Sequence, residues 1–403
     1  MSKVDIILYY DSYVREYDSL LRLKSELKQS NISSVILPNH FMRYYYSLKF
    51  RPKLVVLPFF YNASDGNFRI QKNLNDPLFL NLHSEQIFND DSRVLLLPQD
   101  EPAKDVFHAV WGDRFRRALL EAGVADNLIK ITGNIRNDLI SKVKSRDRID
   151  TVLFPSSFGM TMMPEEYIAD VVKMIGPTAF KEQLDFMARS RIIFFKNILR
   201  LAEENKHVHF ILRPHPHVDL SKFEDTFIAD CDCQELPSNC RIEREGSIHD
   251  FIKGGDVVLA WHSTTALEAA LSNRRVVIHA PLKFPINMSM DYFDYFSIAE
   301  TYEELDKALF DSDENNKMVN EYISDVYFDI DGKSARRMAN YIESLIVDFE
   351  DYPRRSISLM FHYFVKMILV DFTKLVLIKL NLLHRLFPFY GGLLEDRESD
   401  VSN

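Results

Sequence analysis

The sequence predicts an α/β protein with two parallel-sheet domains. Short apolar runs alternate with longer amphipathic stretches, which is typical of parallel strands joined by helices. The chain has 403 residues, more than one domain of about 100–200 residues needs. The alternation restarts after a charged run at residues 142–150. We therefore predict a first domain over residues 1–148, a second over residues 149–350, and a tail over residues 351–403.

The elements of the first domain follow from their periodicity. Apolar runs bounded by turn residues predict buried strands, and an amphipathic stretch at residues 13–29 predicts a helix. The strands are predicted at residues 4–9, 35–37, 54–58, 94–97, 106–110 and 129–132.

The second domain repeats this pattern. A strand at residues 151–154 opens it, and a long helical region that contains several phenylalanines follows at residues 164–205. This region either covers a ligand site or simply packs on the domain. Further strands are predicted at residues 209–212, 256–260 and 275–279, with a helix at residues 264–271.

Composition narrows the possible classes of protein. Apolar residues make up 46% and charged residues 27%, as in ordinary globular proteins, which excludes a disordered chain, a collagen and a polytopic membrane protein. The net charge of −10 disfavours non-specific nucleic-acid binding. Three cysteines cannot form a disulfide framework, and the N-terminus carries no apolar signal core, so we expect a cytoplasmic location. Cys231, Cys233 and Cys240 have no fourth ligand at a standard spacing, so no metal site is predicted.

A proline-bounded histidine follows the predicted strand at residues 209–212. In Arg213-Pro214-His215-Pro216 the two prolines stiffen the turn and remove backbone donors. His215 is therefore held at the carboxyl end of a strand, where open parallel sheets bind ligands. Together with Arg213, it is able to donate hydrogen bonds to a phosphate. The alternative is a rigid turn with a solvated histidine.

A hydroxyl cluster, Ser263-Thr264-Thr265, lies where the helix at residues 264–271 is predicted to begin. Free N–H groups and the positive end of the helix dipole attract anions there, which predicts a phosphate site. Glu268, one turn further, is placed to accept hydrogen bonds from ribose hydroxyls. The alternative is structural, because Thr265-x-x-Glu268 matches a capping box.

Acidic and imidazole side chains are densest at residues 81–86 and 98–101. A general base must be a carboxylate or a histidine close to the nucleophile. We predict Glu85 as the base and Asp100 as the second choice, and either one fits an ordinary surface position as well.

Two turns follow predicted strands and carry small residues. Gly133-Asn134 allows a positive φ and a close approach of backbone to a ligand. Ser156 and Ser157 occupy the corresponding turn at the start of the second domain, where we predict that they help to bind a ligand. Both segments are also compatible with ordinary turns.

The tail differs from the rest of the chain. Residues 354–390 contain six Lys or Arg and one acid, so this segment carries +5 and the remainder −15. On a helical wheel, the basic and polar residues lie mainly on one half and the apolar residues on the other, with Lys379 as an exception. Charges interrupt every apolar run short of the roughly 20 residues that a membrane span needs. We predict a helix lying on a membrane surface; the alternative is a helix that closes the second domain or forms a dimer face.

With these motifs in order, the chain resembles bacterial surface-carbohydrate (capsule and lipopolysaccharide) biosynthesis proteins with a glycosyltransferase-B-like fold. The resemblance covers about residues 80–340. It rests on residues 81–86, Trp111-Gly112, Thr132-Gly133-Asn134-x-Arg136-x-Asp138, residues 154–159, Arg213-Pro214-His215-Pro216, Ser263-Thr264-Thr265-x-x-Glu268-Ala269 and Asp331-Gly332-Lys333-Ser334-Ala335.

The resemblance implies two Rossmann-like domains facing a cleft, with the donor in the second domain and the acceptor in the first. His215 would contact the donor phosphate, the hydroxyl cluster would bind phosphate, and Glu268 would lie near the nucleoside. It implies no metal, since a helix dipole and side chains stabilise the leaving phosphate. It also implies no cofactor, since the nucleotide-sugar is a co-substrate.

The expected activity is an inverting glycosyltransferase that acts on a surface polysaccharide or lipid-linked glycan at the inner face of the inner membrane. A CMP-activated acidic sugar is the favoured donor. The alternatives are a CDP-polyol phosphotransferase, a nucleotide-sugar 2-epimerase of the same fold, and a scaffold that binds glycan without catalysis.

Overall fold

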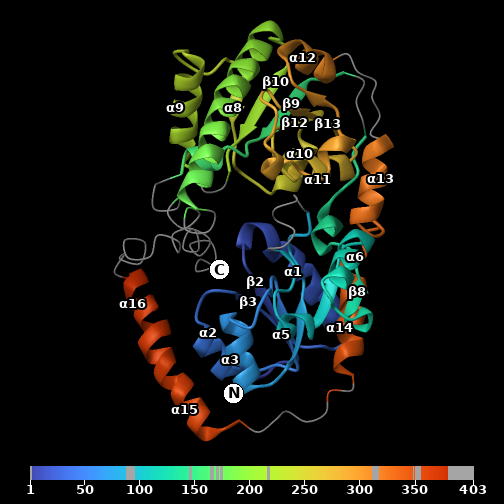
Figure 1. Cartoon of the computed structure of the whole chain (residues 1–403), viewed down its shortest axis with the longest axis vertical. Helices are drawn as coiled ribbons and strands as arrows, with labels where there is room; N and C mark the ends of the chain where they lie inside the picture. The colour runs from blue at the N-terminus through green and yellow to red at the C-terminus, as the bar shows by residue number, and fades with distance from the viewer. Residues whose placement is uncertain are drawn as a thin grey trace. The chain divides into compact units, whose positions relative to one another are not determined.

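The computed structural model forms two compact units, each with its own parallel sheet (Figure 1). It describes residues 2–87, 96–144, 148–163, 176–215, 218–310, 317–347 and 355–379, with the single positions 168, 172 and 349. Unit 1 comprises residues 1–139 and 324–403, and unit 2 comprises residues 140–323. The predicted class of two Rossmann-like α/β domains is confirmed.

The sheet of unit 1 has six parallel strands in the order β3-β2-β5-β6-β7-β8. The chain runs from β2 outward to β3 and then returns to β5 on the other side of β2, which makes a switch point between β2 and β5. The strands are β2 (Ile6–Tyr10), β3 (Ser34–Pro38), β5 (Leu54–Leu57), β6 (Leu78–Asn81), β7 (Phe107–Val110) and β8 (Ile129–Ile131), and β1 (Ser2–Lys3) pairs separately with β4 (Phe50–Arg51).

Helices cover both faces of this sheet. Helices α1 (Tyr13–Gln29) and α14 (Ser334–Ile346) bury their apolar stripes against one face, where Leu23 and Ile342 are fully buried. The opposite face packs against a cluster that includes Phe60 and Ala103. The remaining helices of unit 1 are α2 (Arg43–Lys49), α3 (Gly66–Leu74), α5 (Glu101–Lys104), α6 (Asp113–Glu121) and the 3₁₀ turns η1 (Asp126–Leu128) and η2 (Ile135–Leu139).

The sheet of unit 2 has the order β11-β10-β9-β12-β13-β14, and its strands are also parallel. From β9 the chain moves outward to β10 and β11, then returns to β12 on the other side, so the switch point lies between β9 and β12. The strands are β9 (Thr151–Pro155), β10 (His209–Arg213), β11 (Cys240–Ile242), β12 (Val257–Ala260), β13 (Arg275–His279) and β14 (Ile298–Ala299).

An aromatic core holds the helices of unit 2 on its sheet. Phe154 lies 4.7 Å from Phe194, and Phe158 lies 4.5 Å from Trp261, measured between ring centroids. Phe194 and Phe195 are fully buried, so at these positions the long helix α8 (Pro177–Glu204) packs on the sheet. The other helices are α9 (Leu220–Cys231), α10 (Ile248–Lys253), α11 (Thr265–Leu271), α12 (Tyr302–Phe310) and the 3₁₀ turns η3 (Gly159–Thr161), η4 (Ile286–Met288) and η5 (Phe293–Tyr295), while α13 (Lys317–Val326) crosses the boundary between the units.

The compact units divide the chain at 139/140 and 323/324, whereas the sequence suggested boundaries at 148 and 350. The boundary at 323/324 differs from the predicted 350 because α14 packs on the sheet of unit 1. The buried carboxylate of Asp138 accepts hydrogen bonds from the backbone N–H groups of Ser334 (2.9 Å) and Ala335 (2.8 Å), at the first turn of this helix. Sequence order alone placed α14 with the preceding strands.

The C-terminal segment also returns to unit 1. Arg355 donates hydrogen bonds to the carbonyl oxygens of Ser47, Leu48 and Phe50, at the C-terminal end of α2. Helix α15 (Ile357–Lys366), the π-helical segment η6 (Met367–Phe372) and α16 (Thr373–Lys379) follow. Helix α15 contacts α2 and α3, and η6 contacts α2. The helices of the described part of the chain include none that is both long and apolar enough to cross a membrane.

Most predicted elements match the structure within one or two residues, and the predicted helix at residues 13–29 coincides with α1. Strands β6, β11 and β14 were not predicted. Of the predicted strand at residues 94–97, residues 94 and 95 lie outside the described residues, and Leu96 and Leu97 are not part of a strand.

Candidate functional site

Three loops that carry predicted site residues meet at one edge of the unit 2 sheet. Strand β9 lies between β10 and β12, and all three run parallel, so their carboxyl ends share an edge. Ser156 and Ser157 follow β9, His215 follows β10, and the hydroxyl cluster follows β12. This edge includes the switch point between β9 and β12, where open α/β sheets bind their ligands.

Hydrogen bonds join these loops. The N–H of Ser156 donates to the carbonyl oxygen of Arg213 (2.8 Å), which links the ends of β9 and β10. The hydroxyl of Ser157 accepts a bond from the N–H of His262 (3.3 Å), which links the ends of β9 and β12. The loops are therefore held in a fixed relation before any ligand binds.

His215 is half-buried and packs beside Gly159 of the β9 loop. A Cβ atom at Gly159 would lie 3.1 Å from the Cβ of His215, so glycine leaves room for the imidazole. The carbonyl oxygen of His215 accepts a bond from the N–H of Val218 (2.9 Å). Pro216 and His217 lie outside the described residues.

The guanidinium of Arg213 is engaged by a neighbouring turn of unit 2. This guanidinium donates to the carbonyl oxygens of Glu245 (2.9 Å) and Gly246 (2.6 Å) and lies 5.3 Å from the ring centroid of Phe251. Burial lowers the pKa of this side chain. In this geometry, Arg213 fixes the 245–246 turn beside the strand end.

The hydroxyl cluster lies at the start of α11. This helix begins at Thr265, and Thr264 is its N-cap, without a side-chain capping bond. The capping box considered for Thr265 and Glu268 is wrong, because Thr265 is already the first helical residue. Ser263 turns the chain here, since its hydroxyl accepts a bond from the N–H of Thr265 (3.3 Å). Glu268 is half-buried on α11.

His262 was not predicted as a site residue, although it precedes the hydroxyl cluster. Its Nε2 lies 2.8 Å from the carbonyl oxygen of Met288, so Nε2 carries the proton and donates it. Burial lowers the pKa of His262 and keeps the ring neutral. Phe284 and Phe293 pack against this ring.

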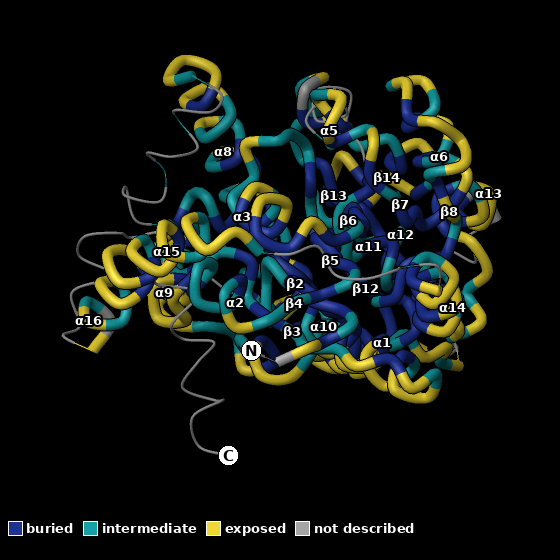
Figure 2. Tube along the Cα trace, turned by 90° about the horizontal axis from the view of Figure 1, so that it is seen from below, coloured by how far each residue is buried: buried dark blue, intermediate teal, exposed yellow. Residues whose placement is uncertain are grey.

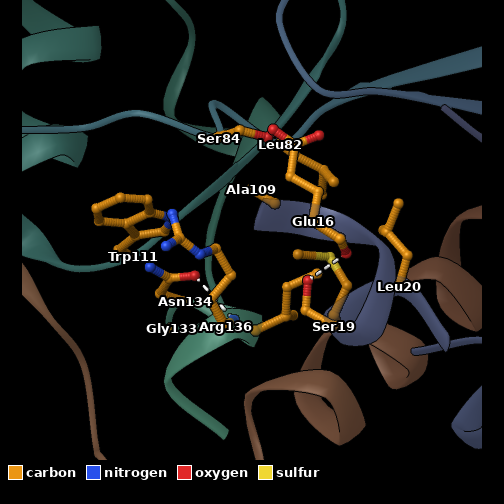
Figure 3. Close-up of a pocket in the computed structure, with 12 residues that line it drawn as sticks. Glu16, Ser19, Leu20, Leu82, Ser84, Ala109, Trp111, Gly133, Asn134 and Arg136 are labelled. Carbon is orange, nitrogen blue, oxygen red and sulfur yellow. Dashed lines mark hydrogen bonds between the residues drawn. The ribbon is translucent and has the colours of Figure 1, made fainter. Parts of the chain in front are cut away.

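Unit 1 contains a pocket of about 410 Å³, a volume that includes the open solvent at its mouth (Figure 3). It lies beyond the carboxyl ends of β6, β7 and β8, beside the N-terminal half of α1. Its lining combines polar groups with an aromatic ring, as in many ligand sites. The lining residues are Glu16, Ser19, Leu20, Leu82, Ser84, Ala109, Trp111, Gly133, Asn134, Ile135, Arg136 and Met338.

Glu16 is the buried carboxyl group of this pocket, with 6% of its surface exposed. Its Oε2 accepts a hydrogen bond from the N–H of Asp11 (2.8 Å). Burial raises its pKa, although that bond and the charges of Arg15 and Arg136 oppose the rise. Figure 3 shows the Glu16 side chain reaching toward Ser84, with Arg136 beside Trp111 on the other side of the pocket.

The two predicted bases occupy different surroundings. Glu85 is half-buried, follows the pocket residue Ser84, and accepts a bond from the N–H of Ile87 (3.3 Å). Both carboxylate oxygens of Asp100 bind backbone N–H groups, those of Ala103 (3.0 Å) and Ala63 (2.8 Å). Asp100 therefore caps α5 and ties it to a neighbouring loop, which is a structural arrangement.

The polar residues of the segment at residues 81–86 mainly form buried hydrogen bonds that hold the fold together. Asn81 donates to the carbonyl oxygen of Phe60 (2.9 Å), and Gln86 accepts from the N–H of Trp111 (2.9 Å). His83 has a positive φ of 46° and lies with its Nε2 2.8 Å from Nδ1 of His108, both rings being buried. The density of polar residues in this segment reflects buried hydrogen bonding.

Sequence reasoning missed Glu16. The residue is one of several acids in an amphipathic helix, and its burial depends on β6, β7 and β8. One signal was available, because Glu16 lies in the first turn of the helix that follows β2, next to a strand end of the switch point.

The cysteines are free thiols, and burial raises the pKa of Cys231 and that of Cys240 to about 12, which keeps both protonated. In the described residues no group of three or more His, Cys, Asp or Glu side chains is arranged to hold a metal ion.

Comparison with known proteins identifies the fold. No protein-family model matches the chain, and no curated protein matches its sequence. A Listeria monocytogenes structure assigned as a UDP-N-acetylglucosamine 2-epimerase matches with a TM-score of 0.54 and 12% identity, over 88% of this chain and 100% of that one. The UDP-GlcNAc 2-epimerase of Methanocaldococcus jannaschii, in complex with UDP-GlcNAc and UDP, matches with a TM-score of 0.50 and 13% identity, over 85% of this chain and 100% of that one. These matches show that the chain shares the fold of these structures, two Rossmann-like α/β domains of the glycosyltransferase-B-like class.

Proposed function

We propose that this protein is a glycosyltransferase that takes a sugar from a nucleotide-activated donor, and that unit 2 binds the phosphate of that donor. One observation carries the proposal: three neighbouring parallel strands bring Ser156 and Ser157, His215, and the 263–265 hydroxyl cluster to one edge of a sheet. Hydroxyl, imidazole and backbone N–H donors are the groups that bind phosphate oxygens.

His215 is the central residue of this donor site. It is half-buried and held against Gly159, so little side-chain freedom is lost when it binds a ligand. Its proposed role is to donate a hydrogen bond to the leaving phosphate, whose negative charge grows in the transition state. Ser263, Thr264 and Thr265 contribute hydroxyl donors, and Glu268 is proposed to contact the nucleoside.

The proton acceptor is proposed to be a carboxylate of unit 1. Glu16 is favoured because it lines a pocket and because burial raises its pKa toward the range in which a general base works best. Glu85 is the alternative, since it follows the pocket residue Ser84. Asp100 is the least favoured, because both of its oxygens hold backbone N–H groups.

In the proposed reaction, the carboxylate removes the proton of an acceptor hydroxyl, and that oxygen attacks the anomeric carbon of the donor sugar. The new C–O bond forms as the bond between the anomeric carbon and the phosphate oxygen breaks. The phosphate leaves with the electron pair, and the configuration inverts. The proposed acceptor is a bacterial surface polysaccharide or lipid-linked glycan, and the resemblance favours a CMP-activated acidic sugar as donor.

Thermal unfolding with CMP, CDP, UDP, GDP and dTDP tests the donor site. A ligand that binds only the folded state raises the free energy of unfolding, and with it the melting temperature. At a ligand concentration of a hundred times Kd, the gain in free energy is about 2.7 kcal/mol. We expect one nucleotide to stabilise the wild type and the exposed control His207→Ala, but not His215→Ala. No shift with any nucleotide, or an undiminished shift in His215→Ala, would contradict the proposed donor site.

The base is tested by Glu16→Gln. We expect kcat to fall about 10²–10⁴-fold, the usual contribution of a general base, with nucleotide binding unchanged. Asp18→Asn is the matched control, because Asp18 is exposed on the same helix. A normal kcat in Glu16→Gln with a loss in Glu85→Gln would transfer the role to Glu85.

Product analysis separates the two other activities of this fold. A polyol phosphotransferase would leave phosphate attached to the transferred group, and a 2-epimerase would convert the donor without an acceptor. Transfer of the sugar without phosphate, only when acceptor is present, is the result expected of a glycosyltransferase.

A further inference from the structure

The outward face of the C-terminal helical segment at residues 357–379 is apolar. Figure 2 shows exposed stretches along both α15 and α16. Ile357 is 86% exposed, Phe361 67% and Leu369 65%, which is unusual for such large apolar side chains. The further exposed apolar residues of this face are Phe364, Val365, Ile368, Val370, Phe372 and Val376.

The opposite face of the same segment is fixed on unit 1. Tyr363, Met367 and Asp371 are buried and recur every four residues. The Tyr363 hydroxyl accepts a bond from Nδ2 of Asn73 (3.1 Å), and the Asp371 carboxylate accepts one from the N–H of Tyr45 (2.8 Å). The segment therefore already has its intramolecular partner, and that partner does not cover the apolar face.

Charge is segregated across this segment. Its one acid, Asp371, points inward, and burial raises its pKa. Lys366 and Lys374 are half-buried and Lys379 is exposed, so the charges that reach solvent between residues 357 and 379 are positive. The neighbouring helix α2 adds the exposed Lys49, and residues 41–64 contain no acid. This distribution contrasts with the net charge of −10 for the whole chain.

We propose that the apolar face of residues 357–379 binds the surface of a bilayer that contains anionic phospholipids. Phenylalanine, isoleucine and leucine side chains would enter the boundary between headgroups and acyl chains, while the flanking lysines contact lipid phosphates. A second copy of the chain fits less well, because a symmetric contact would bring like charges together. This proposal does not depend on the glycosyltransferase activity.

Co-sedimentation of the full chain with vesicles provides the test. We expect binding to vesicles with about 30 mol% phosphatidylglycerol, weaker binding to phosphatidylcholine alone, and a loss of binding as salt screens the lysines. The triple variant Phe361→Ser, Ile368→Ser, Phe372→Ser should bind at least about tenfold more weakly, because three apolar side chains no longer enter the bilayer. All three positions are exposed, so folding should be retained, as circular dichroism would verify.

The control is Ile286→Ser with Val14→Ser, which removes exposed apolar side chains elsewhere (82% and 61% exposed) and should bind like the wild type. Equal binding by the triple variant and the wild type would overturn the proposal, as would no binding of the wild type to anionic vesicles. A dimer in sedimentation velocity that the triple variant loses, without vesicle binding, would assign the face to a second copy instead.

Discussion

The buried His83–His108 pair predicts a measurable acid sensitivity of unit 1. Nε2 of His108 faces the carbonyl oxygen of Lys104 (3.4 Å), so it carries the proton, and Nδ1 accepts the Nε2–H of His83 (2.8 Å). Both rings are therefore neutral. Burial lowers the pKa of His108 to about 4 and that of His83 well below its ordinary value.

The direction in which stability changes with pH follows from the number of protons that the folded and unfolded chains bind. Since the folded pKa of His108 is about 4 and the ordinary value is 6.5, the unfolded chain binds more protons between these values. The stabilisation is present above about pH 6.5 and is lost as the pH falls through this window. For His108 alone, lowering the pH from about 7 to about 5 should remove about 2 kcal/mol from the free energy of unfolding.

His108→Asn removes the titrating ring, while the Asn Oδ1 can still accept the hydrogen bond from Nε2–H of His83. Its loss of volume lowers stability equally at every pH, so the readout is the difference between pH 7 and pH 5. We expect that difference to shrink by about 2 kcal/mol relative to the wild type.

The assay is urea unfolding followed by tryptophan fluorescence in a Trp261→Phe background. The chain has two tryptophans, so Trp111 then reports on unit 1 alone. His362→Asn, an exposed histidine of the same unit, serves as the control and should keep the response of the parent. An unchanged difference in unfolding free energy between pH 7 and pH 5 in His108→Asn would show that His108 does not cause the acid sensitivity.

Three further substitutions test the fold by the same unfolding assay. Asp138→Ala leaves the buried N–H groups of Ser334 and Ala335 without their acceptor, so we expect a loss of about 2–3 kcal/mol, and a loss below 0.5 would contradict the anchoring of α14. Gly112→Ala places a Cβ 2.5 Å from the carbonyl oxygen of Val326, so the backbone must shift. We expect the free energy of unfolding to fall by about 1–3 kcal/mol, and an unchanged stability would contradict this close contact. Asp100→Ala removes the N-cap of α5 and should lower the free energy of unfolding by about 1 kcal/mol. The kcat of the folded variant should stay at the wild-type value, and a large fall in that kcat would make Asp100 the base.

The long elements of the fold are predictable from sequence because their signal is local. The periodicity of residues 13–29 defines α1, and the apolar runs define most of the central strands. Strand β6 was missed because its run, Leu78–Asn81, ends in a buried asparagine that binds the carbonyl oxygen of Phe60. Strands β11 and β14 have three and two residues, too few for a periodic signal.

The candidate site of unit 2 shows what a local motif can and cannot predict. Proline, glycine and hydroxyl residues after apolar runs marked the ends of β9, β10 and β12. The sequence could not show that the Arg213 guanidinium donates its hydrogen bonds to the carbonyl oxygens of Glu245 and Gly246, because these residues lie more than thirty positions further along the chain.

The alternation of strands and helices, the turns at strand ends and the segregation of positive charge into the tail can be predicted from sequence, because each depends on neighbours along the chain. Three features required the folded chain: α14 and the segment at residues 357–379 belong to unit 1, Glu16 is a buried carboxyl group in a pocket, and the apolar face of the tail stays exposed. Each of these depends on groups brought together from distant parts of the chain, and burial, the chief cause of the raised pKa of Glu16, exists only once they have packed.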